Sequence, residues 1–328
     1  MGTHVTPANA TDSSSLRGRV VRIDRGWSTV SCDDHVLRVR NLGVEVAVGD
    51  FVEVSEDLER IAHVHERRSA LTRRQSFEGS RGVRQIVASN IDVVFVVHAV
   101  NAAVNKRRLE RELVLAFDSG ATPVVLVSKA ETVEPDECSR VTAQLQSVAI
   151  DVEVVAISSR TGTGIERVRE LCAPGSTVAF IGASGVGKST LVNTLVGRDL
   201  QRTAEVRSDD QRGRHTTVAA ELIDLPGGAW LLDTPGLRAV TLWTSGIGIE
   251  RAFRDVFDVA DRCRFRDCKH MDEPGCAVRA AIESGELDAE RLESMRRLVA
   301  EELSVEEEQT ERERQQDKRG FRRRRSAP

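Results

Sequence analysis

The sequence is poor in aromatic residues: its 328 residues include 3 Trp, 9 Phe and no Tyr. This scarcity excludes a protein that grips single-stranded nucleic acid mainly by stacking many bases. The chain also lacks any apolar run near the roughly 18–20 residues that span a membrane. Residues 1–15 contain no apolar stretch typical of a secretory signal. We therefore expect a cytoplasmic protein that does not enter a membrane.

A strong net charge is absent as well. The 47 basic and 51 acidic residues leave a formal charge of −4, which excludes a uniformly basic nucleic-acid binder but permits local basic patches. Apolar residues make up 40% of the chain and charged residues 30%, a balance typical of proteins with a large core. The length predicts two or three domains.

Changes in pattern divide the chain. Residues 1–15 are rich in Ser, Thr, Ala and Asn, which predicts a flexible tail. Residues 16–66 contain short alternating β segments separated by Gly, Asp and Asn, which predicts a small barrel. Residues 67–84 hold six Arg against one Glu without a sustained period. We interpret them as a basic linker, either a solvated connector or a strip that contacts phosphates.

Residues 85–245 alternate between continuous apolar runs and amphipathic segments, which indicates a parallel sheet covered on both faces. The predicted strands cover residues 91–97, 123–127, 152–157, 177–181, 221–225 and 229–233, and the predicted helices cover residues 106–117, 137–148 and 165–171.

The remainder of the chain divides again. Residues 246–304 read as a helical, cysteine-bearing domain, and residues 305–328 as a charged tail. Between residues 312 and 325 this tail carries eight basic and two acidic side chains, so it is either a solubilising tail or a docking element.

A phosphate-binding pattern, G-x-x-x-x-G-K-[ST], follows the strand at residues 177–181. It consists of Gly182, Ala183, Ser184, Gly185, Val186, Gly187, Lys188 and Ser189, with Thr190 next. Its glycines let backbone N–H groups turn toward phosphate oxygens, and the helix that follows adds its dipole. Lys188 is expected to reach the β- and γ-phosphates, and Ser189 to bind Mg²⁺. The pattern predicts nucleoside triphosphate binding.

Two later segments suit the γ-phosphate and Mg²⁺. Asp233-Thr-Pro-Gly236 follows an apolar strand, so Asp233 is placed to hold the hydration shell of the metal, and the Gly236 N–H to sense the γ-phosphate. Before it lies Gly213-Arg-His-Thr-Thr217, where either Thr216 or Thr217 is expected to complete the Mg²⁺ shell.

The guanine-reading elements of a GTPase normally follow the phosphate loop, but here the candidates precede it. Ser128-Lys129-Ala130-Glu131 stands at the end of one predicted strand, and Ser158-Ser159 stands at the end of the next. Ligands bind at the carboxyl ends of strands in open α/β sheets. The order of motifs is therefore circularly permuted.

With this order of motifs, the chain resembles the circularly permuted GTPases that act on the small ribosomal subunit, the RsgA or YjeQ family. The resemblance runs from the predicted barrel through the cysteine cluster. It implies a multidomain α/β protein with an N-terminal OB-fold, a circularly permuted P-loop GTPase domain and a C-terminal helical zinc-binding domain. It also implies GTP with Mg²⁺ as ligands, the small subunit and its rRNA as partners, and GTP hydrolysis stimulated by that subunit during its late maturation. We expect a monomer.

The guanine element departs from the pattern [Asn/Thr]-Lys-x-Asp that is usual in this family. Glu131 offers the carboxylate that reads guanine, but its extra methylene displaces the group and adds rotamer entropy. Ser128 lacks the reach of a carboxamide. We predict that GTP is preferred with weaker discrimination or affinity.

Hydrolysis is expected to be slow without a partner. Leu237 stands where many GTPases place a water-orienting Gln, and a leucine cannot orient water. His215 is a candidate for that catalytic role, and Thr217 is a second candidate that would act through Mg²⁺. The other interpretation of His215 is a loop residue that contacts RNA or backbone.

Three of the six cysteines, together with one histidine, form a compact cluster: Cys263, Cys268, His270 and Cys276. Three thiolates and one imidazole at this spacing match a closed, tetrahedral structural zinc site, with one Zn²⁺ per monomer. Such an ion would stabilise a small helical unit that has little core of its own. Cys32, Cys138 and Cys172 are isolated, and we expect them to behave as small buried side chains.

Three functions compete at this point. The first is a GTP-driven assembly factor that holds rRNA mainly by phosphate and shape contacts. The second is a nucleotide-gated RNA-binding switch with little hydrolysis of its own, which Leu237 makes conceivable. The third, an unrelated P-loop ATPase, is disfavoured by the permuted order and by the lack of an evident acidic pair of the ATPase type.

Overall fold

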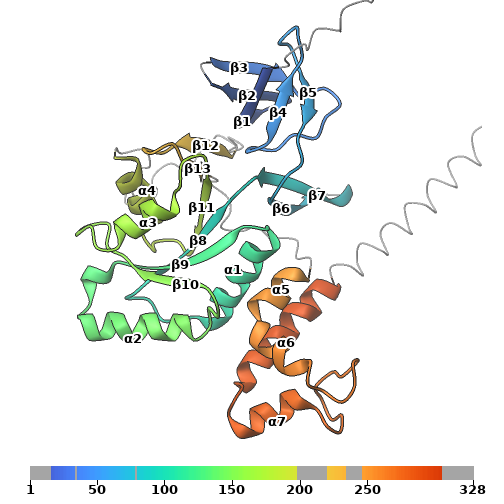
Figure 1. Ribbon diagram of the computed structural model, residues 1–328, viewed down its shortest axis with the longest axis vertical. Coiled ribbons are helices and arrows are strands. Elements are labelled where there is room, and N and C mark those ends of the chain that lie inside the picture. The colour runs from blue at the N-terminus through green and yellow to red at the C-terminus, as the bar shows by residue number, and fades with distance from the viewer. Residues whose placement is uncertain (1–15, 34, 78–79, 198–219, 234–245, 305–328) are drawn as a thin grey trace, which may run out of the picture.

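The structure is a computed structural model that describes residues 16–33, 35–77, 80–197, 220–233 and 246–304. Three parts follow one another along the chain: a set of short strands that curls into a barrel, an α/β sheet, and a helical unit that carries the cysteine cluster (Figure 1).

The first part is a five-stranded barrel. Its strands pair in the order β3-β2-β1-β4-β5, and a parallel bridge between Arg40 and Arg60 brings the two ends of this row together. Alternate side chains point inward, so Val20, Val30 and Val52 are fully buried in one apolar core. The strands are β1 (Leu16–Asp24), β2 (Trp27–Cys32), β3 (His35–Arg40), β4 (Phe51–Val54) and β5 (Ile61–Val64).

The second part has the strand order β10-β9-β8-β11-β13-β12, and it is continuous with the barrel because β12 pairs antiparallel with β1. The first five strands run parallel, and β12 returns antiparallel to β13 as the predicted turn requires. Their carboxyl ends therefore meet at one edge. The strands are β8 (Val93–Ala99), β9 (Thr122–Ser128), β10 (Glu153–Ala156), β11 (Thr177–Gly182), β12 (Glu221–Asp224) and β13 (Trp230–Asp233).

Helices cover both faces of this sheet, as the continuous apolar runs predicted. Val94 and Val96 of β8 pack into the core beneath α1 (Lys106–Asp118) and α2 (Pro135–Gln146). Phe95 and Val97 face the opposite way, into the core beneath α3 (Ile165–Leu171) and α4 (Lys188–Val196). A strand buried on both sides has no polar face, which explains its uninterrupted apolar sequence.

The structure differs from the linker that we predicted over residues 67–84. Most of that stretch belongs to an antiparallel hairpin of β6 (Ala70–Phe77) and β7 (Ser80–Ser89). The base of the hairpin is fixed because Leu71 and Ala88 are buried in the core of the sheet. These two apolar positions are hard to detect in a sequence dominated by arginine.

A buried polar junction joins the barrel to the sheet. The Arg19 side chain, from β1, is 6% exposed and donates hydrogen bonds to the Asn90 carbonyl and the Thr177 hydroxyl. Burial lowers the pKa of Arg19 to about 10. Beside it, the fully buried Asp50 accepts two hydrogen bonds from Arg67, at 2.7 and 2.8 Å. Since Thr177 begins β11, the barrel is anchored at the amino end of the strand that leads to the phosphate loop.

The third part is helical and packs on α1. It contains α5 (Ile247–Ala252), α6 (Arg254–Ala260), α7 (Ala277–Ser284) and a final helix over residues 289–304. The Gly248 N–H donates to the Asp118 carboxylate at 2.7 Å, and Arg291 of the final helix reaches Glu110 of α1 at 2.9 Å. Among the residues described, no helix combines the length and apolarity needed to cross a membrane.

Candidate nucleotide site and metal centre

The phosphate loop begins where β11 ends. Gly182 has a φ of +139°, and a Cβ on it would lie 2.4 Å from the Val97 carbonyl oxygen, so only glycine lets the chain turn this close to β8. Gly187 begins α4 with a φ of +98°. The Lys188 ammonium donates to the Gly182 carbonyl at 2.8 Å and to the Ala183 carbonyl. It therefore lies over the loop, as a phosphate-binding lysine requires.

The loop is both anchored and accessible. Val186 is buried in the core beneath α4, which fixes the middle of the loop. Ser184, Gly185 and Thr190 are exposed, and Ser189 is half-buried at the start of the helix. Backbone N–H groups of such a loop suit phosphate oxygens, and the Ser189 hydroxyl suits Mg²⁺.

The first guanine element touches the phosphate loop. Ser128, at the end of β9, is 5% exposed, and its hydroxyl donates to the Val186 carbonyl at 2.5 Å. A Cβ on Gly187 would lie 3.9 Å from the Lys129 Cε atom, so this lysine side chain passes beside the loop. Two segments separated by more than fifty residues in the sequence are thus in contact.

Glu131 follows in a short 3-10 turn, Ala130–Thr132. Lys129 starts this turn in the left-handed conformation, with a φ of +60°, and the Thr132 hydroxyl donates back to its carbonyl at 2.8 Å. The Glu131 side chain is exposed at the edge where the parallel strands end. A ligand at this edge can reach its carboxylate.

The side chain of Ser158, which follows β10, is buried. Its side chain is 1% exposed, and its hydroxyl accepts the N–H groups of Arg160 and Thr161 at 3.3 and 3.0 Å. The hydroxyl therefore shapes its own loop. Ser159 is half-buried beside it. The Ala130 N–H donates to the Ile157 carbonyl at 3.1 Å, which ties the two guanine elements together.

Asp233 completes the described part of the nucleotide site. It ends β13, the direct neighbour of β11 in the sheet, so its carboxylate is one strand away from the phosphate loop. The other residues predicted for this site, His215, Thr216, Thr217 and Gly236, lie outside the described residues, as does Leu237.

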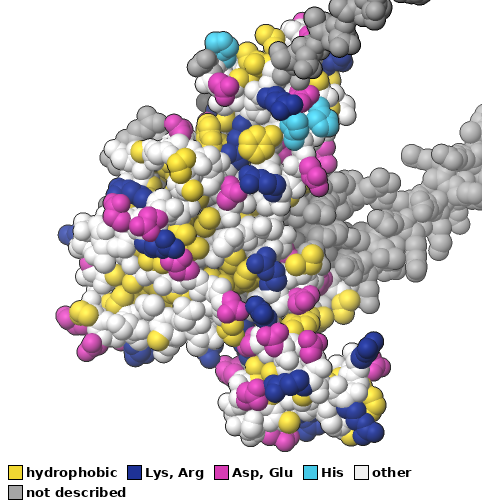
Figure 2. Space-filling view, in the orientation of Figure 1, with side chains coloured by type: hydrophobic (Ala, Val, Ile, Leu, Met, Phe, Trp, Pro, Cys, Tyr) yellow, Lys and Arg dark blue, Asp and Glu magenta, His cyan; other side chains and the backbone are white. Residues whose placement is uncertain are grey.

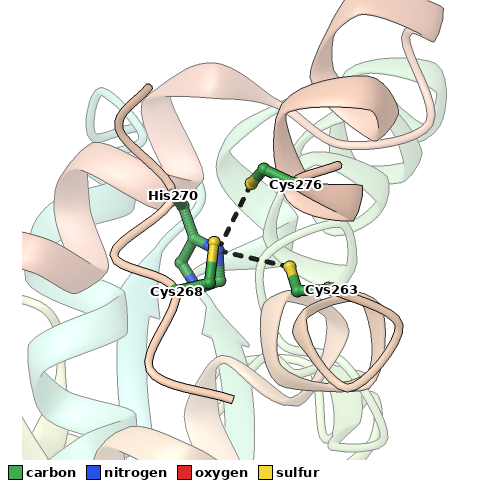
Figure 3. Close-up of side chains that lie close together, drawn as sticks. All are labelled: Cys263, Cys268, His270 and Cys276. Atoms are coloured by element: carbon green, nitrogen blue, oxygen red, sulfur yellow. Dashed lines mark hydrogen bonds between the residues drawn. The ribbon is translucent and has the colours of Figure 1, made fainter. Parts of the chain in front are cut away.

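The four predicted zinc ligands are brought together, as Figure 3 shows. Their ligand atoms all lie within 4.8 Å of one another. The His270 Nδ1 atom is 3.6 Å from the Cys263 sulfur and 3.5 Å from the Cys276 sulfur. A tetrahedral zinc ion with ordinary Zn–S and Zn–N bonds separates sulfur and nitrogen ligands by about 3.5 Å. The residues therefore fit a zinc ion in both chemistry and spacing.

The surroundings favour the metal-binding forms of two of these side chains, His270 and Cys263, whereas burial raises the pKa of Cys268 to about 11. Burial lowers the pKa of His270, and the nearby Arg296 guanidinium lowers it further, so the imidazole is neutral near pH 7. Burial acts to raise the pKa of Cys263, but backbone N–H groups at the start of α7 outweigh it and lower this pKa. A neutral imidazole and a thiolate are the forms that bind metal.

Sequence reasoning missed the residues that hold the metal loop in place. Arg296, on the final helix, donates to the carbonyls of Lys269 and His270 at 3.0 and 2.7 Å. The Glu273 carboxylate accepts the N–H groups of Lys269 and Met271 at 3.0 and 2.8 Å. Arg296 gave no signal because it is one of many charged residues in its helix, whereas Glu273 lies inside the cysteine motif.

Several known proteins are similar to this chain. Residues 64–243 match the model of the family described as RsgA GTPase. A protein of Methanosarcina acetivorans named "Small ribosomal subunit biogenesis GTPase RsgA" is 40% identical over 277 residues, which cover 83% of this chain and 74% of the relative. A protein of the same name from Mesorhizobium japonicum is 40% identical over 296 residues, covering 88% of this chain and 84% of the relative.

Two solved structures share the fold. The crystal structure of YjeQ from Thermotoga maritima superposes with a TM-score of 0.64 at 25% identity, covering 88% of this chain and 98% of that one. The crystal structure of YloQ, described as a circularly permuted GTPase, gives the same TM-score of 0.64 at 21% identity, over 91% and 99% of the two chains.

Proposed function

The chain belongs to the RsgA GTPase family, and from that premise we propose that it binds the small ribosomal subunit and hydrolyses GTP during maturation of that subunit. The observation that carries the proposal is the hydrogen bond between Ser128 and Val186. This bond joins the proposed guanine element to the phosphate loop, which comes later in the sequence. The names of the relatives support the choice of partner.

The phosphate loop would hold the nucleotide through the backbone N–H groups of residues 182–190 and the Lys188 ammonium. Mg²⁺ supplies charge that neutralises the phosphates, and the residues suited to hold it are Ser189, Asp233 and Thr216 or Thr217. Asp233 supports this role because it ends β13, the neighbour of β11, and Ser189 supports it because it lies at the start of α4, the helix that follows β11.

Guanine would be read by Glu131 and by the loop that contains Ser158 and Ser159. The Ser158 hydroxyl shapes this loop from inside, which leaves the neighbouring main chain to face the base. Lys129 would pack along the nucleotide beside Gly187. Ser128 would position Lys129 through its hydrogen bond to the phosphate loop.

We further propose that the barrel is an OB-fold and that the Cys/His cluster binds one structural zinc ion. The β3-β2-β1-β4-β5 order and the parallel Arg40–Arg60 bridge support the first assignment. The donor set and its spacing support the second. Zinc bound by Cys263, Cys268, His270 and Cys276 would cross-link a loop to the start of α7.

A nucleotide-gated RNA-binding switch with little hydrolysis is the second candidate, and Leu237 favours it. Hydrolysis of GTP and of ATP, with and without purified small subunits, separates the two. Subunit-stimulated GTP turnover that disappears in Lys188→Ala and persists in the exposed control Lys106→Ala would support the GTPase. GTP-dependent binding without stimulated turnover would favour the switch, and equal use of ATP would contradict guanine recognition.

A further inference from the structure

The outer face of the barrel carries two histidines and one glutamate on neighbouring strands. Glu53 of β4 lies directly opposite His63 of β5. His65 follows the end of β5, and its N–H donates to the Phe51 carbonyl at 2.9 Å, which places it diagonally across from Glu53. Alternate residues of a strand point to the same face, so both histidines lie on the side of Glu53. The sequence shows no metal motif here, because the carboxylate comes from a different strand.

The spacing of the three side chains matches that of metal ligands. The His65 Nε2 atom is 3.5 Å from the Glu53 Oε1 atom. The ring centres of His63 and His65 are 5.2 Å apart. A tetrahedral ion with ordinary bonds separates a nitrogen and an oxygen ligand by about 3.4 Å, and the ring centres of two bound imidazoles by about 5 Å. Both observed distances therefore suit one shared ion.

A direct hydrogen bond explains the position of the carboxylate less well. Charge-assisted hydrogen bonds between nitrogen and oxygen are about 2.7–2.9 Å long. The Glu53 Oε1 atom is 3.5 Å from His65 and 3.4 Å from the Arg17 Nε atom, so it faces two nitrogens without closely contacting either. An oxygen held at this distance keeps a lone pair for a cation.

The strands under these side chains are fixed, whereas the side chains themselves are accessible. Val52, Val54 and Ile61 are buried in the barrel core, so β4 and β5 cannot slide past each other. The side chains of Glu53 and His65 are 23% and 37% exposed. Histidine side chains lie next to one another on the barrel, beside hydrophobic and basic ones (Figure 2). An ion can reach them from solvent.

One side chain has to turn before an ion is bound. The cysteine cluster is the compact group of ligands among the described residues, and the barrel ligands are gathered less tightly. The His63 ring stands edge-on to the His65 ring, at an interplanar angle of 87°, and His63 is exposed, so its ring is free to rotate. A small rearrangement of one exposed ring is then sufficient.

We propose that His63, His65 and Glu53 form a second metal site, which takes a divalent transition metal ion such as Zn²⁺. Imidazole and carboxylate groups are ligands for such ions, and three protein ligands leave a fourth position for water. Mg²⁺ prefers a shell made of oxygen atoms, which distinguishes this site from the one expected beside the nucleotide. Arg17 competes with the ion for the Glu53 carboxylate.

The test uses the full-length protein after its cysteine cluster has been saturated with zinc, and follows added Zn²⁺ by isothermal titration calorimetry. The wild type is expected to bind one further ion per chain. His63→Ala and His65→Ala should each weaken this binding by about tenfold or more, since loss of a residue that only orients a ligand already costs about 10- to 100-fold. Glu53→Gln removes the charge at nearly constant size and should weaken binding as well.

Two variants make the test selective. Arg17→Gln removes the competing cation and is expected to tighten binding by up to about fivefold, the effect of one exposed ion pair. His35→Ala removes another exposed histidine of the barrel, on β3, and is expected to bind the ion like the wild type. The urea midpoint of each variant shows that the barrel is still folded.

The contrary results are separable. A wild-type chain that binds no further ion would overturn the proposal. Weakening by only one of the two histidine variants would show a single imidazole contact and overturn the shared site. Unchanged binding in all three ligand variants would place the ion elsewhere and overturn it too. None of these results bears on GTP turnover, which tests the nucleotide site independently.

Discussion

Arg291 is the centre of a buried ionic network that joins the helical unit to α1. Its side chain is 7% exposed and forms ion pairs with Glu110 and Asp255, each at 2.9 Å. It also donates to the Ala252 carbonyl at 2.6 Å. Glu110 is itself 4% exposed, and its second oxygen accepts from the Ser294 hydroxyl. We predict that Arg291→Leu destabilises the chain strongly.

The loss of stability in Arg291→Leu depends on the carboxylates that lose their partner, Glu110 and Asp255. Removing one partner of a buried ion pair costs about 3–5 kcal/mol, because the other charge stays in a medium of low polarity. Asp255 is 21% exposed and regains contact with water, so Glu110 accounts for most of the loss. The double variant Glu110→Leu with Arg291→Leu removes both charges of the buried pair, so neither is left without a partner. We expect this double variant to lose only about 1–2 kcal/mol, from the remaining hydrogen-bond partners.

The assay is urea unfolding of the zinc-loaded protein, with hydrogen exchange of the helical unit to locate the loss. Arg254→Leu is the matched control, since Arg254 is 63% exposed and pairs with Asp151 and Asp258 only at the surface. It should cost less than about 1 kcal/mol. The reasoning is refuted if Arg291→Leu costs as little as this control, or if the double variant costs the sum of its two single variants.

Three more predictions follow from the nucleotide and metal sites. Glu131→Asp should raise the preference for GTP over ATP about fivefold, the effect of one better hydrogen bond, in a competition titration; an unchanged ratio would show that Glu131 does not read the base. Cys276→Ser should lower bound zinc well below one ion per chain and lower the melting temperature, while Cys138→Ser on α2 keeps the metal; equal zinc in both would argue against the site. Burial lowers the pKa of His98, so the unfolded chain binds more protons and stability should fall as the pH drops below about 6.5. His98→Gln should reduce the difference in urea midpoint between pH 7.5 and 5.5, and an unaltered difference would exclude His98 as its source.

The sequence was most informative where a local pattern has a single physical solution. Residues 93–99 form a strand because a continuous apolar run must be buried on both faces. The phosphate loop was predictable because its glycines and Lys188 have fixed spacing, and the cysteine cluster because its four ligands fall within fourteen residues. The strand begins and ends two residues later than the predicted range 91–97, and the cluster is as compact as metal binding requires.

Other features depend on partners distant in sequence. The ion pair of Arg291 joins residues 181 positions apart, and nothing in either local sequence marks it. The hairpin of β6 and β7 is fixed by two small buried contacts amid arginines. Ser158 was predicted to belong to the guanine site because of its place after a strand, and in the structure its hydroxyl accepts hydrogen bonds from its own loop. The local pattern predicted the position of Ser158 and could not predict the direction of its side chain.

The polar junction under the barrel bears on how this chain can be divided into fragments. A cut after residue 66, where the sequence pattern changes, would separate Arg67 from Asp50 and leave Thr177 without Arg19. A sheet fragment that starts at residue 67 would leave Arg67 and Thr177 without their hydrogen-bond partners in the barrel. An isolated barrel would keep the buried Asp50 carboxylate without Arg67. Barrel and sheet are therefore expected to unfold together, and a stable fragment has to contain both.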